Sequence, residues 1–217
     1  MPIAFFAKRF IIYNSILCDG GELNMEMPTL IKEKTCFFSG HRPYKFAFEP
    51  ENESEFLTEL KEKIAKTIRE LFEGGYDTFI CGGIYGFDVM CGEAVIELKK
   101  EFPHIQLICM LPFENHHTEY PNEWQTRFLK ILDACDFIDY ISPVKVTGCY
   151  YDRNQKMIEA SSHMVTYFDG RGGGTARVVA SAQSGKLKIT NLYENQPLPE
   201  NITYFVGYDD NYDFNNK

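Results

Sequence analysis

From residue 35 onward, short apolar runs alternate with longer amphipathic segments, and this alternation constrains the fold more than any other feature of the chain. The apolar runs predict strands at residues 35–38, 77–81, 105–111, 137–141, 163–168 and 187–192. The segments between them predict helices at about residues 53–72, 89–102, 121–135 and 152–161, and a last one from the 169–175 loop to about residue 184. Strands separated by helices favour right-handed crossovers. We therefore expect an α/β, Rossmann-like, doubly wound and mostly parallel sheet of about six strands, with helices on both faces.

Length and composition predict one domain with two flanking segments. A chain of 217 residues holds one α/β domain with a sizeable core, and a second full domain would be cramped. We predict that residues 34–193 form the Rossmann-like domain and that residues 1–33 are an N-terminal extension outside the core. Residues 194–217 carry five acidic side chains against one lysine, which predicts an acidic C-terminal tail.

Cysteine usage and apolar run lengths indicate where such a chain works. The seven cysteines are odd in number and form no CxxC pair, so free thiols in a reducing cytoplasm are expected. The apolar-leaning residues 4–17 are interrupted by Lys8, Arg9 and Asn14, and no run of about 18 apolar residues could span a bilayer. We therefore expect a cytoplasmic protein with no membrane partner.

The charge balance bears on the partners of the chain. The net charge of −9 disfavours nonspecific attraction to nucleic acid, which depends on lysines and arginines that neutralise phosphates. Nucleic acid is therefore not expected as a partner. A small anionic ligand is compatible with this charge, because backbone N–H groups and one or two arginines can bind it locally.

Glycine and polar residues collect where predicted strands turn into helices. In open α/β sheets, ligands bind outside the carboxyl ends of the strands, where glycines allow close approach and the following helix offers unpaired N–H groups. The residues that we predict to bind a ligand at this edge are Ser39, Gly40, His41, Arg42, Gly82, Gly83, Gly86, Asp88, Arg153, Asp169, Gly173, Gly174 and Thr175.

Several of these residues have a structural interpretation beside the functional one. Arg42 suits a bidentate phosphate clamp or a surface ion pair, and Arg153 suits a second clamp or a solvated helix charge. His41 suits phosphate binding or acid–base chemistry, or it packs and hydrogen-bonds a carbonyl. Asp88 suits a ribose hydroxyl or the cap of the following helix. Asp169 could bind a hydroxyl or position a water.

Neither a metal nor a cofactor is required by the sequence. Glu114, His116 and His117 resemble a ligand set, but adjacent histidines point in different directions and no third partner has helical spacing, so no metal site is expected. A bound nucleotide or nucleotide-derived ligand is the one group anticipated. The candidates for acid–base catalysis are His41, Asp88, Glu114 and Asp169.

The motifs at the strand ends resemble a known family. They are Ser39-Gly40-His41-Arg42-Pro43, Gly82-Gly83-x-x-Gly86-x-Asp88, Leu111-Pro112-Phe113-Glu114, Trp124, Tyr150-x-x-Arg153-Asn154-x-x-Met157, and Asp169 with Gly174-Thr175. In this order, over about residues 35–192, they resemble the YpsA-like proteins of the SLOG superfamily, whose relatives are DprA-type and LOG-type proteins. The resemblance implies a Rossmann-like fold, binding of a nucleotide or nucleotide-derived ligand and, by analogy, a homo-oligomer.

Departures from the relatives narrow the functions that the resemblance allows. LOG-type enzymes carry a catalytic Glu three residues after the Thr of the glycine loop, whereas Thr175 is followed here by Ala176, Arg177 and Val178. The 82–88 loop resembles the DprA-type loop, but the chain lacks the basic surplus of a DNA-handling protein. The leading hypothesis is binding or sensing of a phosphate-bearing nucleotide-type molecule. The alternative is a hydrolase acting on a nucleotide N-glycosidic or phosphoester bond, and the sequence leaves open whether the chain is an enzyme.

Overall fold

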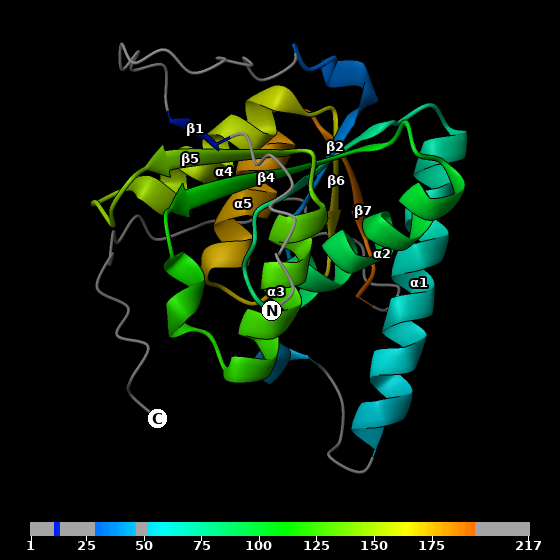
Figure 1. Cartoon of the computed structure of the whole chain (residues 1–217). Helices are drawn as coiled ribbons and strands as arrows, with labels where there is room; N and C mark the ends of the chain where they lie inside the picture. Colours follow the sequence, from blue (N-terminus) through cyan, green and yellow to red (C-terminus); the bar gives the residue numbers. More distant parts are fainter. Residues whose placement is uncertain (1–10, 14–28, 47–51, 194–217) are drawn as a thin grey trace, which may run out of the picture.

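The computed structural model describes residues 11–13, 29–46 and 52–193 (Figure 1). Within these ranges seven parallel strands form a sheet in the order β1-β5-β4-β3-β2-β6-β7. The strands are β1 (Ile11–Tyr13), β2 (Thr35–Phe38), β3 (Thr78–Cys81), β4 (Gln106–Phe113), β5 (Phe137–Ser142), β6 (His163–Thr166) and β7 (Lys188–Asn191). The α-helices are α1 (Glu53–Glu73), α2 (Phe87–Glu101), α3 (Asn122–Ala134), α4 (Cys149–Ala160) and α5 (Gly174–Ser184). The predicted Rossmann-like fold is confirmed.

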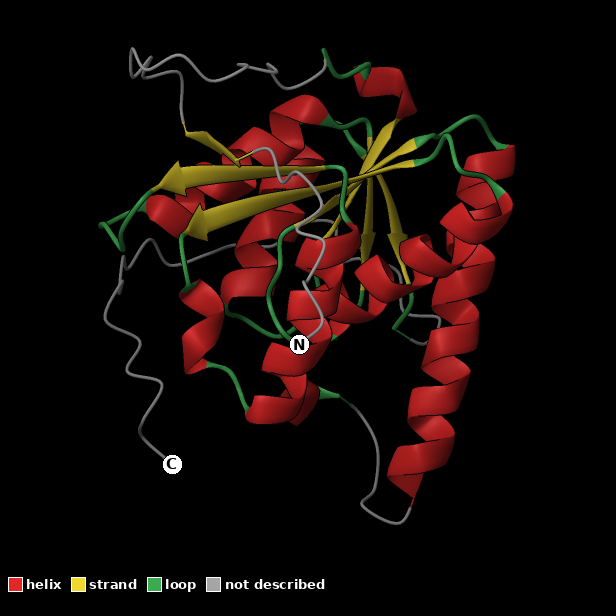
Figure 2. Ribbon diagram, in the orientation of Figure 1, coloured by secondary structure: helices red, strands yellow, loops and turns green. Residues whose placement is uncertain are grey.

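Alternate residues of the central strands face two separate apolar clusters. On β2, Cys36 and Phe38 belong to the cluster that α1, α2 and α3 cover, whereas Phe37 belongs to the cluster under α4 and α5. Figure 2 shows helices on both sides of the strands. All four residues of β2 are buried, which explains why this strand is a continuous apolar run rather than an alternating one. Helix α1 contributes the buried stripe that its sequence predicts, at Leu60, Ile64, Ile68 and Leu71.

The strand order places a topological switch point between β2 and β6. From β2 the chain proceeds to β3, β4 and β5 on one side, and it then crosses to β6 on the other side of β2. The helix after β2 lies on one face of the sheet and the helix after β6 on the other. The turns after β2 and β6 therefore diverge, and this is the place where open α/β sheets bind ligands.

Some element boundaries differ from the sequence prediction for local reasons. Helix α2 begins at Phe87, two residues early, directly after Gly86, whose φ is +103°. Helix α4 begins at Cys149, three residues early, directly after Gly148, whose φ is +84°. A glycine in this region lets the chain turn straight into a helix. The earlier start of α4 puts Arg153 in the second turn of the helix rather than at its beginning.

The flanking segments are described only in part. Ile11–Tyr13, within the segment expected outside the core, pairs with β5 as strand β1, with Ile11 opposite Ile138. The remainder of that segment up to residue 28 and the acidic segment 194–217 lie outside the described residues. No helix in the described ranges combines the length and apolar character that crossing a bilayer requires.

Candidate functional site

A buried hydrogen-bonded set joins the turns after β2 and β6 at the switch point. His41 Nε2 lies 2.8 Å from Asp169 Oδ1, and His41 Nδ1 lies 3.2 Å from Thr175 Oγ1. The Thr175 hydroxyl also lies 3.3 Å from the carbonyl oxygen of Gly40. The side chains of His41 and Asp169 are 2 % and 3 % exposed. The turn after β2, the turn after β6 and the first turn of α5 are thus held together by side chains that the sequence had singled out separately.

Burial and hydrogen-bond partners determine the protonation of His41 and Asp169. Burial lowers the pKa of His41 from 6.5, although the Asp169 carboxylate opposes that shift. Burial alone would raise the pKa of Asp169, but hydrogen bonds from Arg171 and His41 hold it at about 2. At neutral pH the pair is therefore a carboxylate beside a neutral imidazole. Two groups face His41 Nε2, the Asp169 carboxylate at 2.8 Å and the Asp169 backbone N–H at 3.3 Å. The closer and charged carboxylate assigns the imidazole proton to Nε2, which leaves the Nδ1 lone pair toward Thr175.

A second buried network ties the turn after β2 to the turn after β3. The backbone N–H of Gly40 donates to Asp88 Oδ1 at 3.0 Å, and the Arg153 guanidinium donates to the carbonyl oxygen of Gly82 at 2.5 Å. Asp88 and Arg153 are 2 % and 4 % exposed. Burial raises the pKa of Asp88 to about 7, although the positive charge of Arg153 opposes that shift.

This network excludes the structural alternatives that the sequence left open for Asp88 and Arg153. Asp88 is not the cap of α2, because the helix starts one residue before it and Gly86 occupies the cap position without a side-chain hydrogen bond. Arg153 is not a solvated helix charge, since it is buried among Gly82, Asp88 and the turn after β3. The ligand contacts predicted for Asp88 and Arg153 remain predictions.

The glycines after β3 are buried, and close packing explains all three of them. A Cβ on Gly82 would stand 2.0 Å from Arg153 Nη1. A Cβ on Gly86 would stand 2.9 Å from the carbonyl oxygen of His41, and its φ of +103° disfavours any side chain. Gly83 is packed in the same way against Leu111 at 2.7 Å. These glycines let three turns approach one another, and their contact with a ligand stays a prediction.

The glycine turn before α5 is open, unlike the turn after β3. A Cβ on Gly172 or Gly174 would meet nothing within 4 Å, and a Cβ on Gly173 would meet only Lys45 Nζ, at 3.2 Å. Helix α5 begins at Gly174 with no side-chain cap on its first N–H groups. Unpaired N–H groups at a helix start carry partial positive charge. The start of α5 therefore presents exposed amides beside a lysine ammonium group.

Lys45 is a residue that the sequence prediction missed. It lies in the short 3-10 helix Pro43–Lys45 of the turn after β2, and its backbone N–H donates to Arg42 O at 2.9 Å. The available signal was its place in the same strand-to-helix turn as Arg42, three residues along the chain. No pattern in the sequence indicated that its amine would reach the glycine turn after β6.

Arg42 and Ser39 occupy the rim of the turn after β2. Both are half-buried, and the Ser39 backbone N–H donates to the carbonyl oxygen of Val165 at 3.2 Å. The guanidinium carbon of Arg42 lies 5.3 Å from the ring centroid of Tyr85, a cation–π distance. The Tyr85 ring lies 4.9 Å from that of Tyr120, measured between centroids. The phosphate clamp predicted for Arg42 stays a prediction.

The residues after β4 contact the turn after β3, where the Tyr120 hydroxyl donates to the carbonyl oxygen of Gly83 at 3.0 Å. Glu114 is half-buried in the turn after the strand, and His116 is 1 % exposed with Nδ1 3.2 Å from the carbonyl oxygen of Phe113. Burial lowers the pKa of His116 to about 3. In the part of the chain that the structure describes, no group of three or more His, Cys, Asp or Glu side chains could hold a metal ion.

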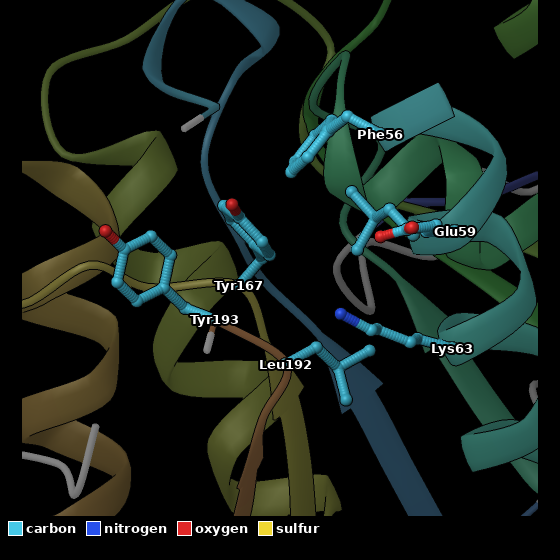
Figure 3. Close-up of a pocket in the computed structure, with 7 residues that line it drawn as sticks. Phe56, Glu59, Lys63, Tyr167, Leu192 and Tyr193 are labelled. Carbon is cyan, nitrogen blue, oxygen red and sulfur yellow. The ribbon is translucent and has the colours of Figure 1, made fainter. Parts of the chain in front are cut away.

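A separate hollow opens between α1 and the ends of β6 and β7 (Figure 3). It is lined by Phe56, Glu59, Leu60, Lys63, Tyr167, Leu192 and Tyr193. Its cavity volume of about 50 Å³ suits a few water molecules rather than a nucleotide. The hollow is thus too small for the ligand that the sequence predicts, and the switch point remains the candidate site.

Comparison with known proteins identifies a family and several relatives. The model of the YspA SLOG family matches residues 36–196. The SPbeta prophage-derived protein YoqJ of Bacillus subtilis is 30 % identical over 167 residues, which cover 70 % of this chain and 97 % of YoqJ. A UPF0398 protein of Staphylococcus epidermidis is 26 % identical over 138 residues, which cover 63 % of this chain and 73 % of that protein.

Two solved structures of DNA processing protein A are similar to this chain at low identity. The protein from Streptococcus pneumoniae is 13 % identical with a TM-score of 0.47, and the match covers 72 % of this chain and 49 % of that one. The protein from Helicobacter pylori is 17 % identical with a TM-score of 0.49, and the match covers 77 % of this chain and 69 % of that one.

The expectation that nucleic acid is not a partner is corrected by this comparison. The Helicobacter pylori structure concerns a single-stranded DNA binding mode, so a protein similar to this chain binds nucleic acid. The expectation relied on the net charge of −9, which is a sum over the whole chain. Binding of a phosphate backbone depends on the cations and amides of one surface. A negative total therefore does not exclude it.

Proposed function

We propose, from the premise that the chain belongs to the YspA SLOG family, that it binds a nucleotide or a nucleotide-derived small molecule through its phosphate. The proposed place is the switch point between β2 and β6, at the start of α5. The observation that carries the proposal is the open glycine turn: its exposed amides lie beside Lys45 Nζ, which comes from a different turn. An ammonium group and unpaired helix N–H groups on one small surface favour a phosphate.

The buried networks support this proposal by fixing the geometry around the open turn. The His41–Asp169 pair links the turn after β2 to the turn after β6, and Gly40 links the former to Asp88. A ligand site whose supporting shell is already ordered loses less entropy on binding. The rigid frame under an exposed, amide-lined turn suits a binding or sensing module.

Equilibrium titration tests the proposal. Nucleoside mono-, di- and triphosphates, ADP-ribose, inorganic phosphate and a single-stranded oligonucleotide are titrated into the full chain, with heat as the readout. We expect saturable binding of a phosphate-bearing member of this panel, weakened about 10- to 100-fold by Lys45→Ala, since a charged hydrogen bond contributes about 1.5–3 kcal/mol.

Lys66→Ala is the matched control. It removes the same charge from an exposed side chain of α1, where Lys66 Nζ lies 3.8 Å from Glu70. Equal weakening by both variants would show a nonspecific charge effect, and no binding by any compound would refute the proposed function. Binding of the oligonucleotide alone would assign the surface to nucleic acid instead.

One observation favours a hydrolase as the second candidate. The pKa of Asp88, raised to about 7 chiefly by burial, lies in the range of a general acid or base at neutral pH. The reaction would be cleavage of an N-glycosidic or phosphoester bond of the bound nucleotide. Turnover of the same panel, lost in an Asp88→Asn chain that still folds and binds, would establish it.

A further inference from the structure

The Thr175 hydroxyl connects a buried histidine–carboxylate pair to the open surface. His41 and Asp169 are almost wholly buried, so neither faces a ligand directly, whereas Thr175 is half-buried in the first turn of α5. Its Oγ1 lies 3.2 Å from His41 Nδ1, and His41 Nε2 lies 2.8 Å from Asp169 Oδ1. The order hydroxyl, imidazole, carboxylate is the arrangement that activates a hydroxyl nucleophile.

The groups that face His41 leave its ring able to accept a proton. An ionised Asp169 accepts the hydrogen on Nε2, which directs the Nδ1 lone pair at Thr175 Oγ1. The hydroxyl hydrogen of Thr175, which is donated to the carbonyl oxygen of Gly40 at 3.3 Å, reaches Nδ1 by rotation about the Cβ–Oγ1 bond. Arg171 donates to Asp169 from its side chain and its backbone, which keeps that carboxylate charged. Lys45 is the further cation near the ring, and the rings of Tyr167 and Phe168 contact its edges.

The surface around Thr175 offers groups that stabilise negative charge on a reacting phosphoryl group. The N–H groups at the start of α5 have no side-chain cap, and Lys45 Nζ lies beside Gly173. Such donors stabilise oxyanions when they are fixed in place before the reaction. A nucleophile, its base, an orienting carboxylate and an oxyanion-binding surface therefore meet where the turn after β2 lies against the turn after β6.

We infer that Thr175, His41 and Asp169 form a relay that transfers the terminal phosphoryl group of a nucleoside di- or triphosphate to Thr175 and then to water. This inference rests on the proposed function, because it needs a phosphate at the start of α5. In the first step a bond forms between Thr175 Oγ1 and phosphorus, and the bond from phosphorus to the bridging oxygen breaks. The hydroxyl proton passes to His41 Nδ1 and then to the departing nucleotide. In the second step a bond forms between a water oxygen and phosphorus while the bond from phosphorus to Thr175 Oγ1 breaks. The water gives a proton to His41 Nδ1, which passes it to Oγ1, so the hydroxyl is restored and inorganic phosphate leaves.

The test compares two substitutions at one position in the full chain. Nucleoside di- and triphosphates labelled at the terminal phosphate are incubated with the wild type, with Thr175→Val and with Thr175→Ser, and protein-bound label and free phosphate are measured after denaturation. Thr175→Val keeps the side-chain shape without the hydroxyl, whereas Thr175→Ser keeps the hydroxyl. We expect Thr175→Val to lower phosphate release at least about 100-fold and Thr175→Ser to retain it, with label on the peptide that holds residue 175.

Separate measurements keep this test distinct from that of the proposed function. Thermal melting verifies that each variant is folded, and titration measures nucleotide affinity in each. A wild-type chain that binds nucleotide but neither takes up label nor releases phosphate overturns the relay and leaves the proposed function standing. Phosphate release that persists in Thr175→Val also overturns the relay. A wild-type chain that binds none of the nucleotides refutes the proposed function itself.

Discussion

Replacing Asp88 by Asn changes how the stability of the protein depends on pH. Burial raises the pKa of Asp88 from 3.8 to about 7 in the folded chain. Below pH 3.8 the carboxyl group is protonated in both the folded and the unfolded state. As pH rises above 3.8 the unfolded chain ionises while the folded chain keeps its proton. The wild type therefore loses stability with rising pH until the folded group ionises near pH 7.

The structure gives the magnitude of this loss. A shift of about three pH units corresponds to about 4 kcal/mol, at roughly 1.4 kcal/mol per unit. At pH 5 somewhat over a third of this penalty is already present, and at pH 8 nearly all of it is, so the difference between the two is about 2–3 kcal/mol. An Asn at this position keeps an oxygen for the Gly40 N–H, now 3.0 Å from the carboxylate, and does not titrate.

Thermal melting of both proteins at pH 5 and pH 8 measures the effect. Other groups, His41 and His116 among them, titrate in both proteins, so the difference between the two melting temperatures isolates Asp88. A loss of about 2–3 kcal/mol in a domain of this size corresponds to about 5–10 °C, so Tm of the wild type should fall by that much relative to Asp88→Asn between pH 5 and pH 8. If the difference in Tm between the wild type and Asp88→Asn were the same at pH 5 and at pH 8, the reasoning would be refuted.

Two further predictions concern the packing of the site and use urea denaturation as the assay. Gly82→Ala should lower the free energy of unfolding by about 1–3 kcal/mol, because its Cβ would stand 2.0 Å from Arg153 Nη1, whereas Gly172→Ala, which meets nothing, should stay within about 0.5 kcal/mol of the wild type. Equal effects of the two substitutions would contradict the packing role. Asp169→Asn should lower the free energy of unfolding by about 2 kcal/mol, since this substitution removes the charged partner of the His41 ring at 2.8 Å. An unchanged midpoint would show that the buried pair contributes no stability.

The sequence predicted the elements of the fold because periodicity is a local property. The apolar run of β2 and the stripe of Leu60, Ile64 and Ile68 on α1 follow from residue order alone. The edge of the sheet that carries the polar turns was also predictable, since parallel strands end on one side. The backbone conformations of Gly86 and Gly148 could not be predicted, and the starts of α2 and α4 were therefore placed two and three residues too late.

The partners of the site residues could not be predicted, because they come from distant parts of the chain. Asp88 accepts from a backbone 48 residues away, and His41 meets Asp169 across 128 residues. Arg153 was predicted to be a second phosphate clamp or a solvated helix charge, and the buried position that the missing side chain of Gly82 gives it was not foreseen. The net charge of −9 led to the wrong expectation about nucleic acid, because it is a sum over the whole chain, whereas binding depends on the charges of one surface.

Amide chemical shifts followed by NMR test the central claim most directly. A nucleotide that binds is titrated into the full chain, and the backbone N–H signals are compared before and after saturation. The account predicts the largest shifts at Gly172, Gly173, Gly174 and Thr175, whose amides start α5, with the Lys45→Ala chain showing the same pattern only at higher ligand concentration. Shifts centred on the hollow around Phe56 and Tyr193, with the α5 amides unmoved, would contradict it.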